Sequence, residues 1–118
     1  MPLLLVVNHS QLRAQLRRLL IKRGFRLIGA EDPAAALVIL SALGGAAALV
    51  IIDSQLADTN GTDLARRVKQ RFPGLRVLLM SSTASQSDCR FCDGLLGKPF
   101  MPADLVEAIH SQLEGPAQ

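Results

Sequence analysis

Side chains that could carry out chemistry follow four short apolar segments of this 118-residue chain. They are an amide with an imidazole, a carboxylate, two hydroxyls and an ammonium group, supplied by Asn8 and His9, Asp53, Ser81 and Ser82, and Lys98. Each has an ordinary explanation by itself, because acids and serines cap helices and lysines cover surfaces. If the fold brings them together, a carboxylate, a hydroxyl and an ammonium group form a site suited to a small anionic group.

The apolar segments have the composition of buried strands. Continuous runs of branched aliphatic residues are typical of strands that are covered on both faces of a parallel sheet. The three clearest runs are Leu3–Val7, Leu49–Ile52 and Val77–Met80. Arg26–Ala30 predicts a weaker strand near an edge, and Leu95–Leu96 predicts a very short one. We therefore expect five strands.

Amphipathic segments with capping residues separate these strands and predict helices. The first begins after Ser10 as N-cap and ends before Gly24; the others cover Pro33–Leu43, Asp63–Phe72 with Thr62 as N-cap, and Pro102 to Leu113. This alternation predicts a doubly wound α/β fold with right-handed crossovers. We expect a flavodoxin-like (βα)5 domain with a five-stranded parallel sheet in the order 2-1-3-4-5, and with the first and last helices on one face.

The fourth crossover is the weakest part of this pattern. Ala84–Asp93 contains serines where a helix needs strong helix formers, and it is too short for three turns. We expect it to be the least ordered part of a domain over residues 1–114, with residues 115–118 as a tail. In open sheets of this type, ligands bind outside the carboxyl ends of the strands, where the polar side chains named above all fall.

Composition narrows the function classes. The chain is 49% hydrophobic and 19% charged, which excludes a disordered protein. With four Phe and no Tyr or Trp, it lacks aromatic platforms for stacking nucleic-acid bases or a flavin. The apolar runs are too short to cross a membrane and the start has no signal-peptide pattern, so we expect a cytoplasmic protein. The net charge of +3 comes from basic helices expected on opposite faces, so nucleic acid is not an expected partner.

Four segments spread over essentially the whole chain share their pattern with one family: LLVVNHS, VIIDSQLADTNGTDL, VLLMSS and GLLGKPF. Together they resemble the receiver domain of bacterial two-component response regulators. The resemblance implies that Asp53, accessible at the rim of the sheet, accepts a phosphoryl group from a phosphohistidine. It also implies that Ser81 hydrogen-bonds the phosphoryl group and that Lys98 contacts it. A cis peptide bond before Pro99 and a glycine at Gly61 complete the pattern.

The chain departs from this family at the metal site. The resemblance implies a Mg²⁺ ion held by two acids after the first strand, by Asp53 and by the backbone carbonyl of Gln55. Asn8 and His9 stand in place of the two acids. Because Mg²⁺ prefers hard oxygen ligands in an octahedral arrangement, imidazole is a poor substitute. We therefore predict a degraded magnesium site.

These observations predict a non-enzymatic signalling module in a two-component phosphorelay. The implied partners are a sensor histidine kinase or phosphotransfer protein, an output domain or other partner protein, and a second copy of the chain. Either Asp53 is phosphorylated weakly, or the domain binds proteins independently of phosphorylation. The alternative from another class is a small flavodoxin-like or CxxC redox protein. Against it, NHSQLRAQ is not a phosphate-binding loop, and Cys89 and Cys92 lie in the fourth crossover, where we expect ordinary reduced thiols.

Overall fold

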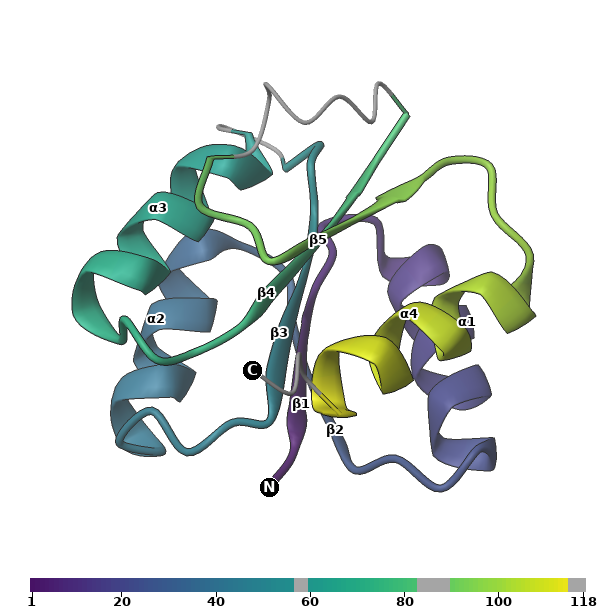
Figure 1. Ribbon diagram of the computed structural model, residues 1–118, viewed down its shortest axis with the longest axis horizontal. Coiled ribbons are helices and arrows are strands. Elements are labelled where there is room, and N and C mark those ends of the chain that lie inside the picture. Colours follow the sequence, from purple (N-terminus) through teal and green to yellow (C-terminus); the bar gives the residue numbers. More distant parts are fainter. Residues whose placement is uncertain (57–59, 83–89, 115–118) are drawn as a thin grey trace.

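The strands form one parallel sheet (Figure 1). The computed structural model describes residues 1–56, 60–82 and 90–114, and in it the strand order is β2-β1-β3-β4-β5. All four strand pairs are parallel, which confirms the predicted topology. The strands are β1 (Leu3–Val6), β2 (Leu27–Ala30), β3 (Leu49–Asp53), β4 (Val77–Ser81) and β5 (Gly94–Gly97).

Helices cover both faces of this sheet (Figure 1). Those in the described residues are α1 (Ser10–Lys22), α2 (Pro33–Ala42), α3 (Gly61–Arg71) and α4 (Pro102–Glu114). Successive strand side chains point to opposite faces, so each face has its own core. On one face, α1 and α4 pack over the sheet through Leu16, Leu20, Leu105, Val106 and Ile109. On the other face, α2 and α3 pack through Ala36, Leu40, Leu64, Ala65 and Val68. This arrangement confirms that the first and last helices share a face.

Two helix caps differ from the sequence prediction. The N-cap of α1 is His9 rather than Ser10, and its Nδ1 accepts the backbone N–H of Leu12 at 3.2 Å. Asn60 caps α3 in place of Thr62, and its side-chain oxygen accepts the N–H of Asp63 at 2.9 Å. In both cases the capping residue lies one or two positions before the predicted one, and its side chain accepts a free N–H group of the first turn. Ser10 is therefore the first residue inside α1, and Thr62 lies inside α3.

The carboxyl-terminal part of the sheet also differs from the prediction in detail. The strand β5 covers Gly94–Gly97 and is longer than the predicted Leu95–Leu96. The predicted lack of order in the fourth crossover falls mainly on residues 83–89, which lie outside the described residues, as does Cys89.

Cys92 is disulfide-bonded in the structure, which corrects the expectation of a reduced thiol there. Among the described residues, no helix combines the length and apolar character needed to cross a membrane.

Candidate functional site

Asp53 ends the central strand β3 at the carboxyl edge of the sheet. Its Oδ1 accepts a hydrogen bond from Lys98 Nζ at 2.8 Å and another from the backbone N–H of Gln55 at 3.1 Å. The side chain is only 6% exposed, so the carboxylate is more deeply buried than its expected place on the rim suggested. A buried carboxylate is unstable without a charged or hydrogen-bonding partner. The ammonium group of Lys98 therefore stabilises the carboxylate of Asp53 in this buried position.

Ser81 and Lys98 reach the same edge from β4 and β5, the next two strands beyond β3. Ser81 is the last residue of β4 and is 5% exposed. Lys98 follows β5, and its backbone N–H donates to the carbonyl oxygen of Ser81 at 2.9 Å. The peptide bond between Lys98 and Pro99 is cis, as predicted. The fold thus brings a carboxylate, a hydroxyl and an ammonium group to adjacent strand ends.

Gly61 explains how α3 begins so close to this site. Its backbone N–H donates to the carbonyl oxygen of Ser54 at 2.8 Å. A Cβ atom on Gly61 would collide with the carbonyl oxygen of Asp53 and would lie 2.9 Å from both Ile52 Cγ2 and Ser54 Cα. Only a residue without a side chain lets α3 start this close to β3.

Asn8 and His9 perform structural roles at the end of β1. The Asn8 side-chain amide donates to the carbonyl oxygen of Glu31 at 3.3 Å, while His9 caps α1. Arg13 reaches back from α1 and donates to the carbonyl oxygens of Val7 at 2.7 Å and of Asn8 at 3.3 Å. The role of Arg13 cannot be predicted from the sequence, because its contact depends on how α1 lies against β1. A guanidinium group is therefore bound to the backbone at the end of β1, beside Asn8.

These side chains do not fit a magnesium ion. Asp53 brings a carboxylate whose Oδ1 is already bound to Lys98. Asn8 brings no charge, and the Nδ1 of His9 is occupied by the helix cap. Within residues 1–56, 60–82 and 90–114, no group of three or more His, Cys, Asp or Glu side chains could hold a metal ion. Hard, mostly anionic oxygen ligands are what Mg²⁺ requires, and the replaced acids no longer supply them.

A polar groove of about 330 Å³ lies beside the carboxyl ends of β3 and β4. Its lining includes the hydroxyls of Ser81, Ser82 and Thr62 and the side chain of Asn60. The sequence predicts Ser81 and Ser82 at this edge, indicates only a capping role for Thr62 and does not indicate Asn60. The pattern Asn-Gly-Thr-Asp, with an amide three residues before an acid, was the available signal for a helix start at this point.

The fold and the placement of the acid–lysine pair define a flavodoxin-like α/β domain with its polar site at the carboxyl edge of the sheet, where such sheets bind their ligands. A family model, the response regulator receiver domain, matches residues 3–110. The chain therefore belongs to the response regulator receiver domains, the family that acts in two-component signalling.

Individual relatives agree with this assignment. The sensor kinase CckA of Brucella abortus (strain 2308) is 28% identical over 118 residues, covering 94% of this chain and 12% of that protein. The transcriptional activator protein ExaE of Pseudomonas putida is 37% identical over 75 residues, covering 58% of this chain and 35% of that protein. A response regulator receiver domain protein from Clostridium thermocellum has the same fold, with a TM-score of 0.87 and 21% identity, over 96% of this chain and 94% of that one. The chain spans well under half of the length of either curated relative.

Proposed function

We propose that this domain is a non-enzymatic, cytoplasmic signalling module whose phosphoacceptor position, Asp53, works without effective help from magnesium. The observation that supports this most directly is the 2.8 Å contact between Asp53 and Lys98, at an edge where Asn8 and His9 replace the acidic pair. The acceptor and its counter-charge are retained, whereas the metal ligands are not. Phosphorylation is then slow, and the domain binds its partners chiefly in the unphosphorylated state.

The acceptor chemistry would use the residues at the three strand ends. Both hydrogen bonds that Asp53 accepts from the described residues end on Oδ1, which leaves Oδ2 to attack phosphorus in line. The O–P bond forms as the N–P bond to a phosphohistidine breaks, and the departing imidazole nitrogen keeps the electron pair and takes up a proton. Lys98 neutralises charge on the transferred oxygens, and the Ser81 hydroxyl donates to one of them.

Loss of the metal ligands predicts a slow reaction. A bound metal ion supplies several kcal/mol of charge stabilisation in such transition states. Each ~1.4 kcal/mol of lost stabilisation slows a reaction about tenfold. Arg13, bonded to the Asn8 carbonyl oxygen, also adds a positive charge beside one of the two replaced positions, which disfavours a dication there. A histidine kinase or phosphotransfer protein would be the phosphoryl donor, and an output domain or separate protein would bind the domain. The kinase and the transcriptional activator among the relatives support both kinds of partner.

The test is phosphorylation by a small-molecule donor, acetyl phosphate or phosphoramidate, with and without Mg²⁺, read as intact mass over time. For the wild-type chain we expect slow incorporation that Mg²⁺ changes by less than about threefold. In the Asn8→Asp/His9→Asp variant we expect Mg²⁺ to raise the rate at least about tenfold, since several kcal/mol of metal stabilisation become available.

Asp53→Asn in both backgrounds is the control for the site of modification, and it should abolish incorporation. Aspartate at position 9 keeps a good helix N-cap, so the double variant is expected to fold. Rapid, stoichiometric and Mg²⁺-dependent phosphorylation of the wild-type chain would show that the replaced acids are not needed, and the proposal would fail.

A further inference from the structure

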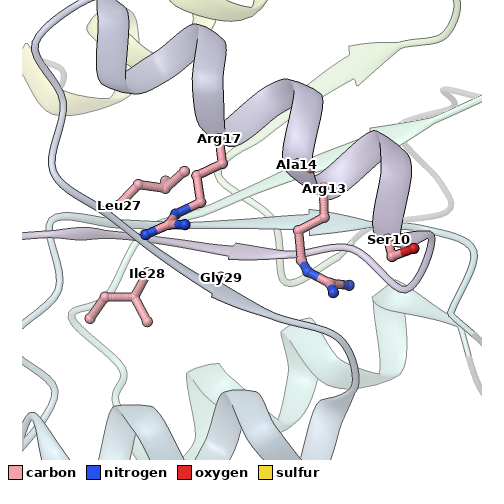
Figure 2. A pocket seen from close by; sticks show the side chains of 7 residues that line it. All are labelled: Ser10, Arg13, Ala14, Arg17, Leu27, Ile28 and Gly29. Atoms are coloured by element: carbon pink, nitrogen blue, oxygen red, sulfur yellow. The ribbon is translucent and has the colours of Figure 1, made fainter.

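Two grooves at opposite edges of the sheet carry charges of opposite sign. The first, here called the basic groove, has a volume of about 540 Å³, lies between α1 and β2, and has Arg13, Arg17 and Gly29 in its lining (Figure 2). The second, here called the acidic groove, has a volume of about 410 Å³, lies between β5 and α4, and has Asp104 and Glu107 in its lining. We propose that copies of this chain associate head to tail, with the basic groove of one copy against the acidic groove of the next.

The basic groove presents positive charge that no ion pair among the described residues neutralises. Figure 2 shows the side chains of Arg13 and Arg17 extending from α1 toward β2. Arg13 is anchored by its 2.7 Å hydrogen bond to the Val7 carbonyl oxygen, whereas Arg17 is exposed. Within the described part of the chain, the ion pairs involve other cations, at Arg66, Lys69 and Lys98. The two arginines are therefore available to an anionic partner.

Gly29 gives the basic groove its depth. It lies on the exposed side of β2, and a Cβ atom there would find Arg13 Cδ at 3.4 Å. Its backbone is not in the left-handed region. A larger side chain at this position would therefore fill the groove without straining the strand.

The acidic groove presents the complementary charge. Asp104 and Glu107 are the charged residues in its lining, and both are exposed. Asp104 is held in place because its carboxylate accepts the N–H of Met101 at 2.9 Å at the start of α4. The partly buried side chain of Leu96, which packs on the same face of the sheet as α4, supplies apolar surface beside the two acids.

The topology places these two surfaces so that a second copy can join them. The helices α1 and α4 cover the same face of the sheet, and β2 and β5 are its two edge strands. A copy displaced sideways across the sheet therefore meets a groove of opposite charge. Edge strands also expose unpaired backbone groups, which favour edge-to-edge contact. Such a heterologous interface leaves one groove of each sign unused at the ends, so assembly continues along a row of copies. Asp53 plays no part in this contact, so the inference is independent of the proposed function.

The test uses sedimentation equilibrium of the full chain at increasing concentration, in low salt and in ~1 M NaCl. For the wild type we expect the average mass to rise with concentration in low salt and to fall to the monomer in high salt, where charges are screened beyond about 3 Å. Arg17→Glu and Glu107→Arg should each weaken association at least tenfold. A 1:1 mixture of the two variants should associate again, because the intact grooves on the two variants are opposite in sign and the two reversed charges are also opposite in sign.

Matched controls separate this contact from a general effect of charge. Arg18→Glu and Glu114→Arg make the same charge changes on α1 and α4 outside both grooves, and they should leave association unchanged. Gly29→Val should weaken association without any change in charge, while far-UV circular dichroism confirms its fold. The inference is overturned if the wild type stays monomeric up to about 1 mM, or if either groove variant associates as the wild type does. A mixture that stays monomeric also overturns it. A monomer that instead binds a fluorescent glutamate-rich peptide through Arg17 would assign the basic groove to a different protein.

Discussion

Replacing Gly61 with alanine adds one methyl group at the place where α3 meets β3. The new Cβ would lie 2.9 Å from Ile52 Cγ2 and from Ser54 Cα, and it would collide with the Asp53 carbonyl oxygen. Two of these three atoms belong to the backbone, and they cannot rotate out of the way. The start of α3 must therefore move away, which also weakens the 2.8 Å hydrogen bond from Gly61 N–H to Ser54.

The size of the effect follows from these contacts. Overpacking a well-packed interior costs about 1–3 kcal/mol, and a lost hydrogen bond costs about 1 kcal/mol more. Alanine recovers up to about 1 kcal/mol through its higher helix propensity. We expect Gly61→Ala to lower the free energy of unfolding by about 2–3 kcal/mol. With an unfolding entropy of about 2.1 cal/mol/K per residue, this corresponds to a Tm lower by about 8–12 °C for a chain of 118 residues.

Urea and thermal unfolding followed by far-UV circular dichroism measure this change, since the chain has no Trp or Tyr to report by fluorescence. Gly74→Ala is the matched control, because no atom lies within 4 Å of the Cβ it would gain and its φ is not positive. It should change the free energy of unfolding by less than about 1 kcal/mol. If Gly61→Ala is as stable as Gly74→Ala, then the close approach of α3 to β3 is not the reason that position 61 requires glycine.

Two further changes test single contacts by the same unfolding measurements. Lys98→Met should lower the free energy of unfolding by about 1–2 kcal/mol more than Asp53→Asn does. The first change leaves a carboxylate that is 6% exposed without its ammonium partner, whereas after the second change Lys98, which is 23% exposed, can turn toward water. Equal losses of stability would contradict this. His9→Ala should cost about 1 kcal/mol through the lost cap to Leu12, and His9→Asp should keep that stability, because aspartate is a preferred N-cap. Equal stability of His9→Ala and wild type would show that the hydrogen bond from Leu12 to His9 does not contribute to stability.

The topology and the position of Asp53 could be predicted because both depend on apolar continuity. Only strands buried on both faces read as unbroken aliphatic runs, and a polar residue directly after such a run must lie at the strand's end. The caps of α1 and α3 could not be predicted to the residue. Ser10 and Thr62 have suitable side chains, yet His9 and Asn60 reach the free N–H groups instead.

Features that depend on contacts between elements were beyond the sequence. The contact of Arg13 with Val7 depends on how α1 packs against β1, which no local pattern encodes. The reason for Gly61 appears only when α3 is placed against β3. The two charged grooves likewise exist only after β2 and β5 have become the edges of the sheet.

The contact between Asp53 and Lys98 has a consequence for the order in which the chain folds. It joins residues 45 positions apart, across the intervening strand β4. Closing a segment of that length costs entropy that grows with its length, so the contact forms only after β4 and β5 have aligned beside β3. Interactions made late in folding change the rate of unfolding rather than the rate of folding. The charges of Asp53 and Lys98 can therefore be altered with little effect on the rate at which the chain folds.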